Sequence, residues 1–195
     1  MRDVPPASPE EARAARRGRV TLFLIAAVCL APIIASYTIY YFYPREAAAN
    51  YGTLLAVPAP AITGSTPAGA PFALSDLHGR WAFVTVSAGA CEAACARDLY
   101  ATRQARTMQG REQDRVVRVL LAGPDVAPAP DVLAQHPGLV VAQATAAMLA
   151  RLPRGATGIY IVDPLGNLVL HFPADPDIKR MATDLGRLLR ASSIG

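Results

Sequence analysis

Two cysteines four residues apart, Cys91 and Cys95, are the residues best suited to chemistry in this 195-residue chain. They follow an apolar run, Phe83–Val86, and a small-residue loop, and they stand where a helix is expected to begin. Side chains at positions i and i+4 of a helix share one face, so the two sulfurs can form a disulfide or bind one soft metal ion. The positive end of a helix also favours the thiolate, which is the nucleophile of disulfide exchange and the metal-binding form.

A structural role is the alternative for this pair, because thiols outside the cytoplasm tend to oxidise. However, a disulfide that closes so short a loop constrains little of the unfolded chain, so reactive chemistry explains the pair better. The third cysteine, Cys29, lies in an apolar stretch and is given no role. Three cysteines cannot build a disulfide framework, so the fold must depend on an ordinary hydrophobic core.

The apolar stretch Val20–Tyr43 has no charged side chain and is long enough to cross a ~30 Å hydrocarbon core as a helix. The arginines that flank it are Arg13, Arg16, Arg17 and Arg19 before it, and Arg45 after it. The positive-inside rule therefore predicts a single-pass anchor in a bacterial inner membrane, with residues 1–19 in the cytoplasm and the rest in the periplasm. A signal peptide cleaved at Ala47–Ala49 is the alternative, but the stretch exceeds the length of a signal-peptide core.

Residues 44–71 are rich in proline, glycine, serine and threonine, and we expect them to form a semi-extended tether. Leu54–Val57 within this tether is a candidate for a short edge strand. The net charge of the whole chain is +4, without the clustered basic patch that nucleic-acid binding requires. A nucleic-acid partner is therefore not expected.

A compact α/β domain is predicted over residues 72–192, where strand and helix patterns alternate. The expected strands are Phe72–Leu77 (a short strand and turn), Trp81–Val86, Val116–Ala122, Leu139–Ala142, Ile159–Val162 and Leu168–Phe172. The expected helices are Glu92–Gln109, Asp131–Gln135, Ala144–Leu152 and a last helix that begins after Asp175. This order predicts a central mixed sheet flanked by helices.

Four features together resemble the Sco/SenC family: the N-terminal anchor, the Phe-x-Leu-x-Asp-x-x-Gly turn at Phe72–Gly79, the Cys-x3-Cys pair after a strand, and Asp-Pro-x-Gly at Asp163–Gly166. The resemblance implies a thioredoxin-like fold. It also implies a role in assembling the copper site of cytochrome c oxidase, with Cys91 and Cys95 as the copper-binding and redox pair. The implied partners are the copper-site subunit of the oxidase or a periplasmic copper chaperone, and copper(I) is the only cofactor that it suggests.

The chain departs from this family at the third copper ligand. A histidine is expected near Gly155, where none is present, and Thr157 stands where thioredoxins carry a cis-proline. His171 is the candidate replacement ligand, and regular hairpin pairing would place it opposite Ile159. A solvated surface or edge-strand histidine is the favoured alternative for His171. We expect His78 and His136 to be solvent-exposed. The arginines that follow the cysteines are expected on a solvated face: Arg97, Arg103, Arg106, Arg111, Arg115 and Arg118.

These observations favour a membrane-anchored periplasmic thiol–disulfide protein, a possible thiol–disulfide oxidoreductase, in which Cys91 attacks a partner disulfide and Cys95 resolves the mixed disulfide. One alternative is a copper(I) carrier or scaffold that uses the two thiolates, with or without His171. Another is a general periplasmic dithiol reductase. A peroxiredoxin is disfavoured, because Ala88 stands where that class carries threonine or serine.

Overall fold

The computed structural model describes residues 9–42, 50–124, 126, 128–192 and 194. The chain divides into two units, Met1–Ala49 and Asn50–Gly195, and each is described by itself. The tail residues 1–8, the residue Tyr43 and the alternative cleavage site Ala47–Ala49 lie outside the described residues.

The first unit contains one helix, α1 (Pro9–Phe42), within its described part. This helix begins earlier than the predicted anchor, because the residues after Pro9 are mostly glutamate, alanine and arginine, which are good helix formers, and proline is favoured in a first turn. Its segment Arg19–Thr38 is long and apolar enough to cross a membrane. Pro32 lies inside the helix, as membrane helices tolerate.

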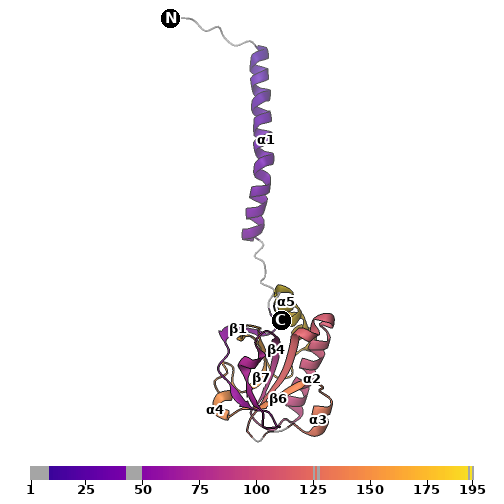
Figure 1. Cartoon of the computed structure of the whole chain (residues 1–195). Coiled ribbons are helices and arrows are strands. Elements are labelled where there is room, and N and C mark those ends of the chain that lie inside the picture. Colours follow the sequence, from indigo (N-terminus) through magenta and orange to yellow (C-terminus); the bar gives the residue numbers. More distant parts are fainter. Residues whose placement is uncertain (1–8, 43–49, 125, 127, 193, 195) are drawn as a thin grey trace. The chain divides into compact units, whose positions relative to one another are not determined.

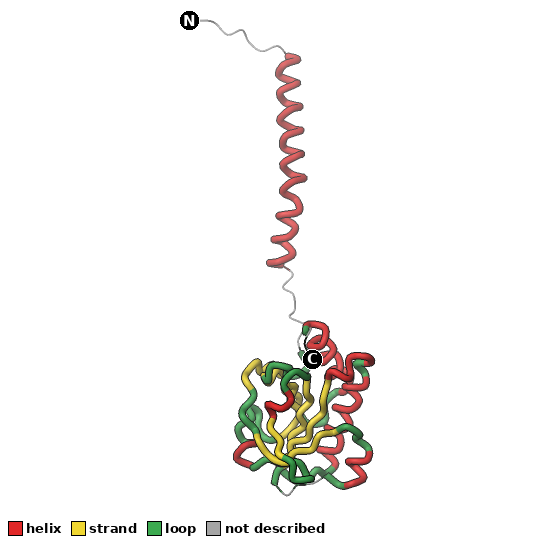
Figure 2. Tube along the Cα trace, viewed as in Figure 1, coloured by secondary structure: helices red, strands yellow, loops and turns green. Residues whose placement is uncertain are grey.

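The second unit is built on a sheet with helices packed against it (Figures 1 and 2). The strands of this sheet follow the order β1-β8-β7-β4-β5-β6-β2-β3. The parallel strands are β4, β5 and β6, whereas β7 pairs antiparallel with β4, and β8 pairs antiparallel with β7. In chain order the strands are β1 (Thr53–Pro58), β2 (Thr63–Ser65), β3 (Pro71–Ala73), β4 (Trp81–Ser87), β5 (Val116–Ala122), β6 (Leu139–Gln143), β7 (Thr157–Val162) and β8 (Asn167–Phe172). The mixed sheet confirms the predicted fold class.

Helices pack on this sheet and connect its strands. The helices are α2 (Ala93–Thr107), α3 (Pro130–Ala134), α4 (Ala146–Leu149) and α5 (Ile178–Ala191), with 3-10 turns η1 (Leu74–Leu77) and η2 (Gly110–Arg115). α4 is shorter than the helix predicted over Ala144–Leu152. It starts at its N-cap, Thr145, whose hydroxyl accepts a hydrogen bond from the Met148 N–H.

The central strand β4 is buried on both faces, as its continuous apolar sequence predicts. On one face, Phe83 belongs to a buried cluster that includes α2 residues and Leu185 of α5. On the other face, Val84 belongs to a cluster that includes Leu77 of η1 and Leu149 of α4. Each fully buried side chain of this size contributes about 1.5–3 kcal/mol, so β4 holds a fixed position between the two layers.

Part of the predicted tether belongs to the sheet. β1 and β2 lie within residues 44–71, and the second unit begins at Asn50. β1 pairs antiparallel with β8 and covers the candidate edge strand Leu54–Val57, while β2 pairs with β3 and, at Ser65, with β6. Pro58 ends β1, Pro60 and Pro67 lie in loops, and Pro71 begins the edge strand β3, all of which are positions that a sheet tolerates.

The first residues of this unit, Tyr51 and Gly52, form hydrogen bonds and a cation–π contact with residues at the start of helix α5 and within it. The Gly52 N–H donates to the buried carboxylate of Asp184, at 2.9 Å, and the Tyr51 hydroxyl accepts from the Asp177 N–H, also at 2.9 Å. The Tyr51 ring also lies under the guanidinium of Arg180, 4.4 Å from its centroid. The chain therefore enters the domain along α5.

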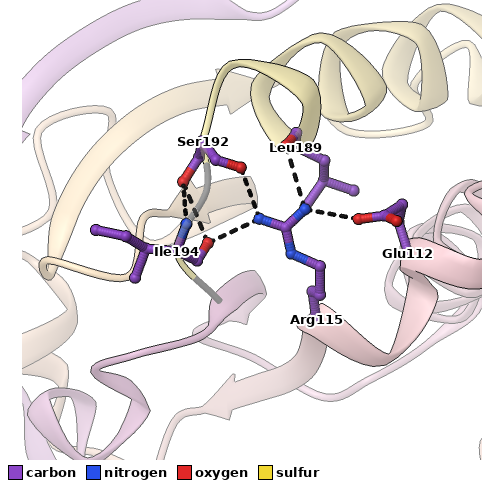
Figure 3. A network of polar contacts seen from close by, with 5 residues as sticks. All are labelled: Glu112, Arg115, Leu189, Ser192 and Ile194. Carbon is purple, nitrogen blue, oxygen red and sulfur yellow. Dashed lines mark hydrogen bonds and ion pairs between the residues drawn. The ribbon is translucent and has the colours of Figure 1, made fainter.

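Arg115 forms hydrogen bonds with backbone carbonyls at and just after the C-terminal end of α5 (Figure 3). Its guanidinium donates to the backbone carbonyls of Leu189, Ser192 and Ile194, at 3.2, 2.8 and 2.8 Å. It also pairs with Glu112, at 2.6 Å. Carbonyls at the end of a helix lack partners within that helix, so this side chain satisfies groups that would otherwise need water.

Replacing Arg115 with alanine should lower the free energy of unfolding by about 2–3 kcal/mol, because several charge-assisted hydrogen bonds are lost together. Urea unfolding of the full chain in detergent measures this change. Arg111→Ala is the matched control, because Arg111 is exposed in the same turn η2. It should change the stability by less than about 0.5 kcal/mol. Equal losses in the two variants would show that the contacts at the end of α5 contribute little.

Candidate functional site

Cys91 and Cys95 form a disulfide at the edge of the sheet where β4 ends, with their Cα atoms 5.0 Å apart. The loop that leads from β4 to Cys91 is held by its neighbours. The Gly123 N–H donates to the Ser87 carbonyl at 2.9 Å. A Cβ atom at Gly123 would lie 2.4 Å from the Ala88 carbonyl oxygen, so only glycine allows this approach. The loop therefore places the first cysteine shortly after a central strand that is buried on both faces.

The two sulfurs have different surroundings. Cys95, in the first turn of α2, is 7% exposed and packs with Leu99 and Leu120. Cys91 lies before the helix and is only partly buried. In disulfide exchange the more accessible sulfur is the one that a partner can reach, so this asymmetry favours Cys91 as the attacking residue.

The start of α2 supplies a positive electrostatic environment for Cys91. Its N-cap residue is Glu92, and among the described residues no side chain caps the first turn. The first N–H groups of the helix are therefore available to a negative charge at its end, and the helix dipole favours the thiolate there. Because the helix begins at Ala93, Cys91 precedes it by two residues, whereas the sequence places the start at Glu92.

Asp98, which sequence analysis did not single out, lies one turn after Cys95 and is buried. Its carboxylate accepts a hydrogen bond from the Asp175 N–H at 2.8 Å, which holds the loop before α5 against α2. Burial raises the pKa of Asp98, and the hydrogen bond from Asp175 opposes this shift. Asp175 has a positive φ of 53°, so the bond also supports a strained backbone position. The sequence signal that could have revealed the burial of Asp98 is the position of an aspartate on the apolar face of a predicted helix.

His171 lies opposite Tyr160, not opposite Ile159 as predicted. The register shifts between Ile161 and Val162, where β8 carries a bulge at Val169. One extra residue in a strand moves every later side chain by one position. As a result His171 shares the face of Tyr160, whose buried cluster lies on the side of the sheet away from α2.

The His171 ring is occupied by local contacts. It lies 4.6 Å from the Tyr160 ring, and its Nε2 donates to the Thr157 carbonyl at 3.3 Å. Burial lowers the pKa of His171, the hydrogen bond to Thr157 opposes this, and Arg154 lowers it further. Within the described ranges, no three side chains among histidine, cysteine, aspartate and glutamate come together as a metal site. The structure thus joins Cys91 to Cys95 but does not add His171 to them.

His136 is buried, 6% exposed, which corrects the prediction that it is solvated. Its Nδ1 accepts from Arg118 at 3.4 Å, and Arg118 also donates to the Pro137 carbonyl at 2.9 Å. Burial lowers the pKa of His136, and the charges of Arg118 and Arg103 lower it further. His78 is exposed, as predicted.

Arg118 is likewise not on a solvated face, because it is only 3% exposed. Burial lowers its pKa to about 10, with smaller contributions from Arg106 and Arg103. Its position inside the apolar run of β5 was the signal that could have revealed this burial. The other arginines of the stretch, including Arg97 and Arg111, are exposed or partly exposed.

Gly155 and Thr157, the positions expected to match a copper-ligand histidine and a cis-proline, lie at the same sheet edge as the cysteines. Thr157 begins β7 and pairs with Ser87 at the end of β4. Gly155 has a φ of +84°, and its carbonyl accepts from the buried Tyr160 hydroxyl at 2.9 Å. No cis peptide bond occurs among the described residues. The Tyr160 hydroxyl therefore holds this loop in place, and no cis-proline precedes β7.

A mixed sheet with a Cys-x3-Cys disulfide at the end of a central strand defines a thioredoxin-like domain. Residues 81–192 match the family described as "Transmembrane-like, thioredoxin-like, C-terminal domain", and residues 12–43 match "Transmembrane-like, N-terminal domain". The chain belongs to this family. The N-terminal match and the apolar segment of α1 identify a membrane anchor. No curated protein matches the sequence.

Solved structures with this fold include Sco proteins. Arabidopsis thaliana ScoI with copper bound is 14% identical over 70% of this chain and 100% of its own, with a TM-score of 0.58. Yeast Sco1 with copper bound is 13% identical over 72% of this chain and 96% of its own, with a TM-score of 0.59. The thioredoxin domain of a thiol-disulfide oxidoreductase from Bacteroides vulgatus is 15% identical over 70% and 99%, with a TM-score of 0.52. The resemblance to the Sco/SenC family is confirmed at the level of the fold.

Folding stability should fall as the pH drops below about 6.5, because His136 and His171 must take up protons in a buried environment. Their pKa values in the folded chain are lower than the value of about 6.5 in unfolded peptides. The stability that their neutral rings contribute is therefore present above about pH 6.5 and lost as the pH falls through the folded pKa values.

Urea midpoints of the full chain and of a His136→Gln/His171→Gln variant, measured across this range, test the prediction. The variant should show a flatter pH profile, whereas His78→Gln, at an exposed position, should keep the steep one. Parallel profiles for all three chains would contradict it. Asp98 acts with the opposite sign at lower pH, because its pKa is raised, but its contribution is common to the three chains.

Proposed function

We propose that this protein is a membrane-anchored thiol–disulfide protein of the periplasm that assists copper-site assembly in cytochrome c oxidase. The observation that carries the proposal is the disulfide between a partly exposed Cys91 and a buried Cys95 at the start of α2. The anchor supports a membrane location, and the arginines before it support a cytoplasmic N-terminus. The Sco-like fold supports the oxidase as the setting.

The exchange proceeds in two displacement steps. The Cys91 thiolate attacks a disulfide of the copper-site subunit or of a copper chaperone, a mixed disulfide forms, and one partner thiolate leaves. The Cys95 thiolate then attacks the Cys91 sulfur and releases the second partner thiolate. The partner gains two electrons and two protons, and this chain ends as the Cys91–Cys95 disulfide seen here. A dithiol donor in the same compartment must reduce it again.

A trapping experiment tests this order of attack. In a Cys29→Ser background, Cys95→Ser should accumulate a mixed disulfide with an oxidised copper-site subunit, because Cys91 attacks and nothing resolves the product. Cys91→Ser should trap at least about tenfold less, since the remaining sulfur is buried. Non-reducing gels and mass spectrometry read the adduct. Equal trapping by both variants would contradict the assigned roles, and no trapping by either would contradict exchange with this partner.

Copper(I) binding by the reduced pair is a second candidate function, because two sulfurs whose Cα atoms lie 5.0 Å apart can bind one ion. The chain would then act as a copper carrier, and copper(I) is cargo in this case. Thiolates are soft ligands and suit copper(I) without a third group, although a third ligand would increase the affinity.

Titration of the reduced full chain with copper(I) against a competing chelator tests the carrier function, again in the Cys29→Ser background. Cys91→Ser should abolish binding. His171→Ala should leave the affinity unchanged within about threefold, because His171 is engaged with Tyr160 and Thr157 on the other face of the sheet. Loss of affinity in His171→Ala would show that this histidine is a third ligand after all.

A further inference from the structure

Helix α5 presents a solvent face whose charged side chains are all cationic. The exposed charged residues of α5 are Lys179, Arg180, Arg187 and Arg190. With 3.6 residues per turn, these four side chains and Thr183 fall within an arc of about 100° along about 16 Å of helix. We call this set the α5 cationic face.

The acidic groups near this face neutralise it only in part, because among the described residues the one ion pair of its four cations joins Arg187 to Asp184, at 3.5 Å. Asp184 lies on α5 but is 2% exposed, and its carboxylate accepts from the Gly52 N–H and from Arg187. Asp177 caps the N-terminus of α5 by accepting from the Arg180 N–H, and Asp175 pairs with Arg97 of α2. The α5 cationic face therefore carries an excess of positive charge toward solvent.

The chain that leads to the anchor starts beside this face. Tyr51 is held by the Asp177 N–H and lies under Arg180, and Gly52 is held by Asp184. The anchor helix ends at Phe42, and Asn50 is the first residue of the second unit. Covalent geometry alone limits the connection between these two residues to about 30 Å.

We propose that the α5 cationic face docks on anionic lipid headgroups of the membrane that holds the anchor. Attraction between exposed charges acts mainly within a Debye length, about 8–10 Å at physiological salt. The short connection limits how far the domain can move from the bilayer and so permits an approach to that distance. Juxtamembrane lysine and arginine clusters gain binding energy from each cation near an anionic surface. Docking would hold the domain in one orientation. This inference does not depend on the redox chemistry of the cysteines.

Lys179 provides the readout, because it is the only lysine in the chain. The full chain is placed in nanodiscs of phosphatidylcholine alone and of an equal mixture of phosphatidylcholine and phosphatidylglycerol. An uncharged amine-specific reagent labels Lys179, and peptide mass spectrometry separates it from the N-terminal amine. Labelling should be at least about threefold slower in the anionic nanodiscs, because a docked amine is shielded and lies in the proton-rich layer at the surface. At about 1 M salt the difference should disappear.

Arg180→Gln/Arg190→Gln should lose the lipid dependence of Lys179 labelling. The matched control is Arg80→Gln/Arg151→Gln, which removes the same charge from exposed positions beside η1 and α4, on the other layer. The single variant Arg190→Gln leaves the Arg180–Tyr51 stacking in place and should lose part of the lipid dependence of Lys179 labelling. The proposal therefore remains testable even if the double variant misfolds. Equal Lys179 labelling in both nanodiscs, as expected if the face instead met an acidic protein, would overturn the proposal.

Discussion

The burial of β4 on both faces is the constraint on which the rest of the domain depends. β4 pairs with β5 on one side and with β7 on the other, and each of its faces carries its own apolar layer. A strand held in this way cannot slip or tilt without exposing both layers. Its end, and therefore the position of Cys91, is fixed by packing that involves neither sulfur.

Much of this arrangement follows from local sequence patterns. The continuous apolar runs of β4 and β5 predict buried central strands, and the apolar spacing after Asp175 predicts α5. The location of the thiol pair was also predictable from local patterns. Cys91 and Cys95 follow a buried strand and a small-residue loop, and they stand where a helix was expected to begin. Local propensity and tertiary packing agree here, so the sequence alone was sufficient.

The features that the sequence could not predict depend on register or on contacts between distant segments. His136 is buried and contacts Arg118 of β5, and nothing in the local sequence around a histidine that precedes a proline predicts this contact. The strands β1 and β2 resemble a linker because prolines and glycines lie in and around them, yet backbone pairing with β8 and β3 determines their structure. Asp98 shows the same limit. Its place on the apolar face of α2 follows from the sequence, but its hydrogen-bond partner, the Asp175 N–H, lies in the distant loop before α5.

The bulge at Val169 decides which layer each side chain of β8 joins. In a regular hairpin, His171 would share the helix-covered face with Ile159, and Leu170 and Phe172 would turn away from α5. The bulge instead keeps Leu170 and Phe172 in the layer beneath α5. Exchanging the faces would remove two large side chains from this layer, and a fully buried side chain of this size contributes about 1.5–3 kcal/mol. Hydrophobic packing in a strand remote from the thiols thus keeps this imidazole off the face of the sheet that α2 covers, without a substitution at either cysteine.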